Sequence, residues 1–218
     1  MNNQNAGSFL MNMPETSGVY AITDCENITA DEVLSRTESI LRIGVALFQY
    51  RNKTDDQNVK RALALKLQSL CKKYKTPFIV NDDLKLAEEI AADGIHLGQH
   101  DKEIETARAV LGNKIIGISC YNDFNRAVIA EQSGADYIAF GSFFPSSTKP
   151  DELKADIDLI VKAKEKLTVP IVAIGGITPE NGKELINAKV NYLAVISGLY
   201  SAPDTINSTL AYKQLFTK

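Results

Sequence analysis

The feature that most constrains the fold of this sequence is a regular alternation of two kinds of segment. Short apolar runs rich in Val, Ile and aromatic residues recur, and each is followed by a longer stretch with helical spacing of apolar residues. The short runs predict eight strands, at 19–23, 47–50, 77–80, 94–97, 114–119, 137–141, 170–174 and 192–197. The longer stretches predict helices near 31–42, 57–74, 84–92, 104–111, 125–133, 153–167, 179–188 and 204–215.

The strands themselves indicate a parallel sheet covered by helices. The runs 115–118 and 171–174 are apolar on both faces, as buried parallel strands must be. An open doubly wound sheet would have similar strands, but eight regular units within 218 residues favour closure. We therefore predict an α/β protein with a single (β/α)8 TIM-barrel domain over 18–218, preceded by a flexible N-terminal segment, 1–17.

Two helix starts carry recognisable signals. Thr178 precedes Pro179, which suits a capping hydroxyl followed by proline at the first helical position. Asp55 and Asp56 come just before the helix predicted from residue 57, where acids are stabilised by the helix dipole.

Composition excludes several classes of protein. The formal net charge is -3, whereas nucleic-acid binding needs a basic surplus. The three cysteines form no CxxC or Cys/His pattern and are typical of reduced intracellular thiols. The sequence has neither a signal-peptide pattern nor an apolar run long enough to span a bilayer. We expect a cytoplasmic protein that binds neither nucleic acid nor membrane.

Charged residues gather where the predicted strands end, which is where TIM barrels place their active sites. The cations are Arg51, Lys53 and Lys149, and the acids are Asp82 and Asp101. Each alone could be a solvated surface charge. Together they suit a polyphosphate bound with Mg²⁺, because this ion needs only one or two carboxylates beside phosphate oxygens and water.

A second cluster follows the last two predicted strands. Gly175 and Gly176 end one strand, and Ser197 and Gly198 end the other. These are the loops that commonly bind a phosphate monoester in TIM barrels, although a tight turn would also need glycine. The long irregular stretch 142–152 precedes them, and loops of that length are more often functional than idle.

The two histidines do not indicate a catalytic triad or a metal site. His96 lies within an apolar strand, which favours a hydrogen-bonded structural role or a place behind the site, and His100 is expected to be exposed. Neither has the partner spacing of a zinc site or a Ser-His-Asp triad, so hydrolytic chemistry is disfavoured.

Five segments in order resemble the thiamine phosphate synthase family. They are Gln49-x-Arg51-x-Lys53, Asn81-Asp82, residues 92–101, residues 141–149 and residues 173–177, and the resemblance extends over nearly the whole chain. It implies condensation of 4-amino-2-methyl-5-hydroxymethylpyrimidine diphosphate with 4-methyl-5-(2-hydroxyethyl)thiazole phosphate, giving thiamine phosphate and pyrophosphate. In the family, pyrophosphate leaves first and the thiazole nitrogen captures the resulting cation.

The resemblance also implies roles for individual residues. The residues implied to hold the pyrimidine diphosphate are Gln49, Arg51, Lys53, Asn81, Ser119 and Lys149. Four of these are implied to be catalytic: Arg51, Lys53, Ser119 and Lys149. The residues implied to hold the thiazole phosphate are Ser146, Thr148, Gly176, Ile196 and Ser197. Asp82 and Asp101 are implied to bind Mg²⁺. A homodimer is the implied assembly.

Some positions depart from the commonest family pattern. Asp83 stands where many members have arginine, Ser146 where many have threonine, and Cys120 with Tyr121 where many have a small residue and histidine. The loop 150–155 lacks a glycine often found there.

Three alternatives account for parts of the sequence. A thiazole tautomerase of the same superfamily needs no diphosphate site and is expected to have a catalytic histidine where this chain has Tyr121. A non-catalytic phosphate-ligand sensor could keep the glycine loops but would not need the acids and lysines. A phosphosugar isomerase or epimerase could use Asp82 and His96 as acid and base, which leaves the extra cations unexplained.

Overall fold

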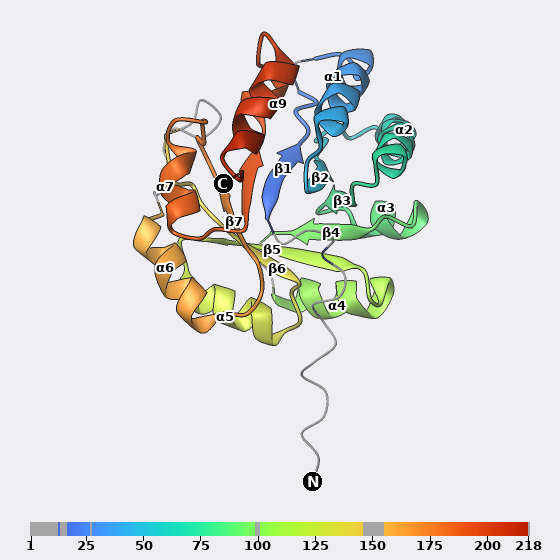
Figure 1. Ribbon diagram of the computed structural model, residues 1–218. Coiled ribbons are helices and arrows are strands. Elements are labelled where there is room, and N and C mark those ends of the chain that lie inside the picture. Colours follow the sequence, from blue (N-terminus) through green and yellow to red (C-terminus); the bar gives the residue numbers. More distant parts are fainter. Residues whose placement is uncertain (1–12, 14–16, 27, 99–100, 146–154, 218) are drawn as a thin grey trace.

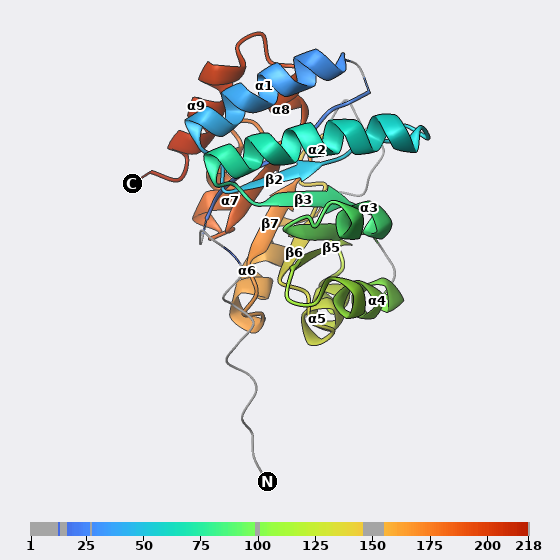
Figure 2. The same ribbon diagram turned by 90° about the vertical axis from the view of Figure 1, so that its right-hand side faces the viewer.

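The strands close into a barrel with the helices outside it (Figure 1 and Figure 2). The computed structural model describes residues 13, 17–26, 28–98, 101–145 and 155–217, without the side chains of residues 101–103. Within these residues eight parallel strands pair in chain order, and the last pairs with the first. The predicted (β/α)8 barrel is therefore confirmed. Most of the predicted segment 1–17 lies outside the described residues.

The element bounds agree with the predicted segments to within a few residues at most ends. The strands are β1 Gly18–Ile22, β2 Leu47–Tyr50, β3 Phe78–Asn81, β4 Gly94–Leu97, β5 Ile115–Tyr121, β6 Tyr137–Phe140, β7 Ile171–Ile174 and β8 Tyr192–Val195. The helices in the described residues are α1 Ala30–Ile43, α2 Gln57–Tyr74, α3 Leu84–Glu89, α4 Asp101–Leu111, α5 Phe124–Gln132, α6 Ile157–Lys166, α7 Gly182–Asn187, α8 Ser197–Tyr200 and α9 Thr205–Gln214.

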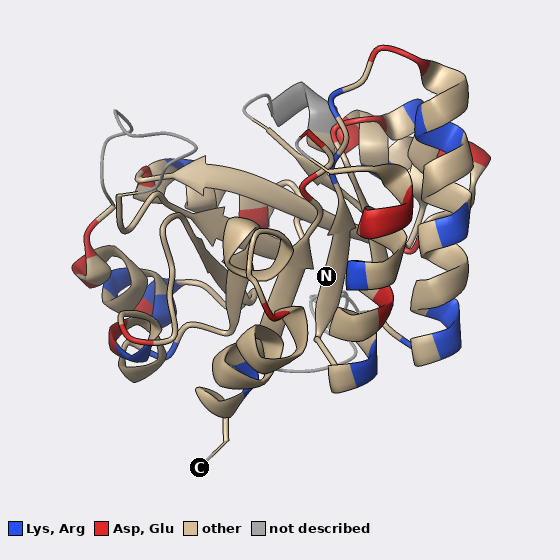
Figure 3. Ribbon diagram, turned by 90° about the horizontal axis from the view of Figure 1, so that it is seen from above, with Lys and Arg blue, Asp and Glu red and all other residues tan. Residues whose placement is uncertain are grey.

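The barrel has two cores, because successive residues of a strand point to opposite faces. The larger core fills the space between the sheet and the helices and includes Phe48, Ile95 and Leu193. The smaller core fills the barrel and includes Tyr20, Tyr137 and other inward residues. None of the eight strands contains Lys, Arg, Asp or Glu, so the charges lie on helices and loops (Figure 3).

Side-chain caps explain where several helices begin. Thr29 forms a capping box with Glu32 at the start of α1, and Asp56, one of the acids expected near the next helix start, caps α2. The expected start of α7 at Pro179 is wrong. Thr178 and Asn181 cap each other in a turn, with Thr178 N donating to Asn181 Oδ1 at 2.8 Å, and α7 follows from Gly182.

The last strand is shorter than predicted. It ends at Val195 rather than at residue 197, because the Ile196 carbonyl accepts hydrogen bonds from both Leu199 N and Tyr200 N at 3.0 Å. Those bonds wind residues 197–200 into α8, so Ser197 begins a helix instead of ending a strand.

In the part of the chain that the structure describes, no helix combines the length and the apolar character that crossing a membrane requires.

Candidate functional site

Because the eight strands are parallel and pair in order, their carboxyl ends meet at one end of the barrel. Gln49 near the end of β2, Asn81 at the end of β3, and Ser119 near the end of β5 are thereby brought to the same rim. Predicted site residues far apart in the chain therefore share one end of the barrel, the end at which TIM barrels bind substrate.

A cluster of opposite charges follows β2. Nη1 of Arg51 lies 3.4 Å and Nζ of Lys53 3.2 Å from the same oxygen, Oε1 of Glu26. Hydrogen bonding and charge from Lys53 hold the pKa of Glu26 below its ordinary value, and Arg51 adds to this effect. Thr23 fixes the backbone beneath, since its hydroxyl accepts from Arg51 N at 2.8 Å and donates to Arg51 O at 2.9 Å. Two predicted phosphate-binding cations therefore lie side by side.

The carboxylate of Asp82 stands at the next strand end. Its backbone continues the β3 ladder, with Asp82 N donating to His96 O at 2.9 Å, and then turns into the left-handed region at a φ of 60°. Nδ2 of Asn81 donates to Asp82 Oδ2 at 2.7 Å. The other oxygen, Oδ1, lies 4.0 Å from the position that a Cβ on Gly98 would take, so it is directed towards the end of β4.

Among the described residues, the groups around Asp82 offset only part of the cost of desolvating its charge. Its side chain reaches solvent, yet the surrounding protein desolvates the carboxylate and raises its pKa. The hydrogen bond from Asn81 and the charges of Arg51 and Lys60 lower the pKa without cancelling that rise. A carboxylate in this state is stabilised by a bound cation.

The structure explains the departure at Asp83. One carboxylate oxygen caps α3 by accepting from Leu86 N at 3.0 Å, and the other lies 3.2 Å from Nζ of Lys60. Asp83 therefore starts a helix and pairs with Lys60, a cation that sequence reasoning missed because it lies within the amphipathic pattern of α2.

Ser119 contacts His96 inside the barrel. Oγ of Ser119 lies 2.9 Å from Nε2 of His96, and Nδ1 of His96 lies 3.0 Å from the Tyr137 hydroxyl. Burial lowers the pKa of His96 to about 4, so the ring is neutral at physiological pH. The predicted structural or supporting role of His96 fits this geometry. The pairing of β5 with β6 shifts register between Ser119 and Tyr121, a bulge of the kind that re-aims side chains beside active sites.

Arg126 on α5 is a residue that sequence reasoning missed. Its Nε donates to Ser119 O at 2.9 Å and its Nη2 to Gly98 O at 3.1 Å. The guanidinium also lies 5.9 Å from the centre of the Tyr121 ring. Arg126 therefore ties the ends of β4 and β5 together. A charged residue on the face of a helix that packs towards a strand end would have been the signal.

The glycines after β7 have a demonstrable structural role. Gly175 and Gly176 have φ of 101° and 60°, and a side chain on either would overlap the loop that follows β6, at Ser142 or Pro145. Phe144 N donates to Gly175 O at 3.1 Å across this contact. The two loops can approach this closely only without side chains. A phosphate role for Gly176, Ile196 and Ser197 stays a prediction.

Several predicted residues lie outside the described part of the chain. They are Ser146, Thr148, Lys149 and His100, together with the side chain of Asp101. α4 begins at Asp101, so this residue follows β4 on the same rim as Asp82. Among the described residues, no group of three or more His, Cys, Asp or Glu side chains is arranged to hold a metal ion.

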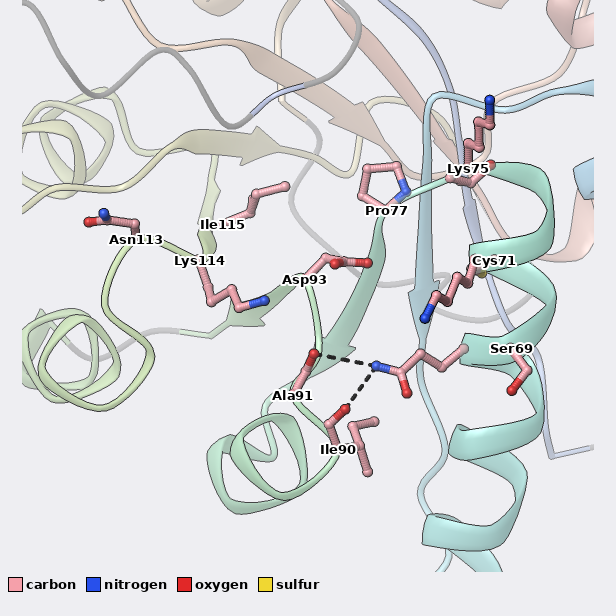
Figure 4. Close-up of a pocket in the computed structure, with 13 residues that line it drawn as sticks. Ser69, Cys71, Lys75, Pro77, Ile90, Ala91, Asp93, Asn113, Lys114 and Ile115 are labelled. Atoms are coloured by element: carbon pink, nitrogen blue, oxygen red, sulfur yellow. Dashed lines mark hydrogen bonds between the residues drawn. The ribbon is translucent and has the colours of Figure 1, made fainter.

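A distinct cavity of about 790 Å³ lies at the opposite end of the barrel (Figure 4). It lies between the end of α2 and the starts of β3 and β5, and its lining includes Gln68, Cys71, Lys72, Lys75, Asp93 and Lys114. Nε2 of Gln68 donates to Ile90 O at 2.9 Å within it. We place the functional site at the carboxyl ends of the strands, because the paired cations and the desolvated carboxylate lie there.

The fold defines the chain as a TIM barrel, and comparison with known proteins then gives its family. Residues 19–199 match the family model described as thiamine monophosphate synthase. Thiamine-phosphate synthase of Nitrosococcus oceani is 47% identical over 200 residues, covering 91% of this chain and 92% of that protein. The same-named protein of Thiobacillus denitrificans is 45% identical, covering 91% and 94%.

A solved structure agrees with these relatives. Thiamine phosphate pyrophosphorylase from Pyrococcus furiosus superposes with a TM-score of 0.82 at 31% identity, covering 92% of this chain and 95% of that one. The chain belongs to the thiamine monophosphate synthase family. The resemblance drawn from the sequence is thus confirmed, and the tautomerase alternative is not favoured, since the relatives are named as synthases.

Proposed function

We propose that this chain condenses the hydroxymethylpyrimidine diphosphate with the thiazole phosphate to give thiamine phosphate and pyrophosphate. The observation that carries the proposal is the rim formed by β2 and β3, where Arg51 and Lys53 lie together near the desolvated carboxylate of Asp82. Relatives named as synthases over more than nine-tenths of the chain support it. A transferase acting on two small phosphorylated molecules accounts for both the family and the charges.

In this proposal the cations after β2 hold the diphosphate. Arg51 can donate two parallel hydrogen bonds to phosphate oxygens, and Lys53 acts as a point charge beside it. Lys149 would approach from the loop after β6. Gln49 and Asn81 would contact the same substrate from β2 and β3. Glu26 now pairs with both cations, so a diphosphate would compete with it for them.

The carboxylate of Asp82 fits a bound Mg²⁺. One of its oxygens is directed towards the end of β4, from which the chain leads to Asp101, and its pKa is raised because the surrounding protein desolvates it. Asp82 and Asp101 would hold the ion, with diphosphate oxygens and water completing its coordination. When bound, Mg²⁺ would stabilise the negative charge that grows on the departing pyrophosphate.

The thiazole phosphate would lie on the other half of the rim. Gly176 and the turn at Ile196 and Ser197 follow neighbouring strands β7 and β8, the position at which many TIM barrels bind a phosphate. Ser146 and Thr148, on the loop after β6, would complete this side. Two phosphate sites facing each other across the barrel mouth would bring the two reacting atoms together.

The chemistry requires no covalent nucleophile from the protein. The bond from the pyrimidine methylene carbon to the diphosphate oxygen breaks first, and both electrons leave with pyrophosphate. The thiazole nitrogen then donates its lone pair to the methylene cation. Arg51, Lys53 and Lys149 stabilise the leaving anion, and Ser119 holds the pyrimidine. Preorganised charge of this kind supplies the largest part of many enzymatic accelerations.

The direct test supplies both substrates and Mg²⁺ to purified protein and follows thiamine phosphate and pyrophosphate together, with an EDTA-treated control. We expect equal amounts of both products and loss of both with EDTA. Pyrophosphate without thiamine phosphate would contradict the thiazole pocket. Neither product from folded protein would contradict the synthase proposal and favour a sensor.

We also infer a homodimer in the cytoplasm. Family resemblance supports the dimer, which sedimentation equilibrium would test. The three cysteines form no disulfide with one another, and Cys71 and Cys120 are buried, as suits a reducing compartment.

A further inference from the structure

A chain of hydrogen bonds crosses the interior of the barrel and links two predicted substrate residues. Nε2 of Gln49 lies 2.8 Å from the Tyr20 hydroxyl, which lies 2.7 Å from the Tyr137 hydroxyl. Tyr137 lies 3.0 Å from Nδ1 of His96, and Nε2 of His96 lies 2.9 Å from Oγ of Ser119. The five residues come from β2, β1, β6, β4 and β5, so the hydrogen bonds connect opposite sides of the barrel.

The surrounding packing holds these five hydrogen-bonded side chains in one arrangement. Tyr20, Gln49 and Tyr137 are at most 2% exposed, and His96 is 9% exposed. Gly117 is required here, because a side chain on it would overlap the Tyr137 ring. The Tyr20 and Tyr137 rings meet edge to face, and the His96 ring stacks on Tyr137 with centres 5.6 Å apart. Ser119 alone among the five is partly open to solvent.

The hydrogen-bond roles follow in sequence from one end. The structure places the Gln49 amide nitrogen against the Tyr20 oxygen, which accepts from it, and the buried Tyr20 hydrogen then has the Tyr137 oxygen as its acceptor. Tyr137 then donates to Nδ1 of His96. A neutral imidazole carries one proton, so the proton of His96 lies on Nε2 and is donated to Ser119. Every member donates in the same direction.

We propose that Tyr20, Tyr137 and His96 are positioning residues that form a directional relay from Gln49 to Ser119. The relay makes the Ser119 oxygen an acceptor from His96 and leaves its hydrogen to be donated to an acceptor atom of the pyrimidine. Burial raises the pKa of both tyrosines and lowers that of His96, so no member changes its protonation near neutral pH. The ligand assignment rests on the proposed function, whereas the direction of the relay does not.

Nitrogen NMR of histidine tests the direction without any substrate. The chain has two histidines, so ¹⁵N-histidine labelling of a His100→Gln variant isolates the signals of His96. We expect a protonated, pyrrole-type Nε2 and an unprotonated, pyridine-type Nδ1 from pH 8 down to pH 5. A protonated Nδ1 would mean that the chain runs in the reverse direction, and would overturn the proposal.

Two variants locate the step that sets the tautomer. Tyr137→Phe removes the donor to Nδ1, so we expect His96 to show a mixture of both tautomers. Tyr20→Phe leaves that donor in place but removes the hydroxyl that directs its hydrogen, so we expect a smaller fraction of the second tautomer. The matched control is Tyr200→Phe, which removes a buried hydroxyl bonded to Thr37 outside the barrel. An unchanged tautomer in Tyr137→Phe would contradict the relay.

Kinetics test the consequence for the pyrimidine. We expect Tyr137→Phe to lower kcat/KM for the pyrimidine diphosphate about tenfold, as loss of an oriented hydrogen bond implies, with KM for the thiazole phosphate unchanged. Tyr200→Phe should lower stability comparably without this loss. Equal kinetic losses in the two variants would reduce the relay to a structural role. Absence of product from wild-type protein would contradict the proposed function alone, because the NMR result still decides the relay.

Discussion

The two ends of the barrel differ in how their polar side chains are paired. At the amino ends of the strands, three acceptor side chains are satisfied by backbone N–H groups. Asp93, Asp136 and Asn191 each precede one strand and accept from the first residues of its neighbour, at Phe78 N, Ile116 N and Ile171 N, at 2.8–3.0 Å. At the carboxyl ends, two cations share one carboxylate and the desolvation of Asp82 is only partly offset.

Arg108 shows how extensive the pairing is at the amino end, although its Nε is buried without a hydrogen-bond partner. Its guanidinium donates to the carbonyls of Gly112, Lys114 and Gly134 and to Asp136 Oδ2 at 2.7 Å. Groups satisfied in this way stabilise the fold and have little left to offer a ligand. The cations that share one carboxylate, together with the usual place of the active site in TIM barrels, favour the carboxyl end as the ligand-binding end.

The largest expected effect is on catalysis, from the carboxyl end. Arg51→Ala should lower kcat/KM by about 10²–10³, or about 3–4 kcal/mol of transition-state stabilisation, with little change in the free energy of unfolding. Steady-state kinetics and urea unfolding of the same preparation measure both. Arg61→Ala is the control, since Arg61 pairs with Glu89 at 3.7 Å on the helical surface. Equal activity in both variants would contradict the site.

The reverse pattern is expected at the amino end. Asp136→Ala should lower the free energy of unfolding by about 3 kcal/mol, because it leaves Arg108 half-buried without its carboxylate. At a temperature where the variant is folded, kcat should stay near wild type. Asp158→Ala, an exposed acid of α6, should change stability by less than about 0.5 kcal/mol. A selective loss of kcat in Asp136→Ala would contradict the prediction that the amino end serves stability and not catalysis.

Titration of His96, inside the barrel, should make the free energy of unfolding depend on pH. Its pKa is about 4 in the folded chain and near 6.5 when unfolded, so the unfolded chain binds more protons between these values. The stability that comes from keeping His96 neutral is fully present above pH 6.5. It is lost as pH falls, by about 2 kcal/mol of unfolding free energy at pH 5. Urea unfolding from pH 7.5 to 5 should show a shallower loss for His96→Gln than for wild type. Parallel curves would show that His96 does not titrate this way.

The smallest effect concerns Glu26. Glu26→Gln removes the carboxylate that competes with phosphate for Arg51 and Lys53, so pyrophosphate should inhibit product formation a few-fold more strongly, within about 1 kcal/mol. The control is Glu38→Gln, since Glu38 pairs with Lys73 at 2.7 Å elsewhere. Weaker inhibition in Glu26→Gln would show that Glu26 helps to bind the ligand instead of competing with it.

The sequence predicted the barrel because its signal is repeated eight times and strands such as 115–118 and 171–174 are apolar on both faces. It also placed Gln49, Asn81 and Ser119 near strand ends, where parallel topology alone brings them to one rim. It did not predict the start of α7 or α8, because mutual capping by Thr178 and Asn181 and the bonds to the Ile196 carbonyl are local geometry.

The interior relay was also beyond sequence reasoning. Tyr20 and Tyr137 are 117 residues apart and look like ordinary core aromatics in the sequence. Their contact depends on strand register and on the space left by Gly117. The same holds for Glu26 and Arg126, whose partners are set by how loops and helices fold back on the rim.

The most direct test is a crystal structure of the chain with the pyrimidine diphosphate and Mg²⁺. We predict the diphosphate at the carboxyl ends of β2 and β3, contacting Arg51 and Lys53, with the metal on Asp82 and Glu26 displaced. A diphosphate bound instead in the cavity beside Lys72, Lys75 and Lys114, at the opposite end of the barrel, would contradict the account.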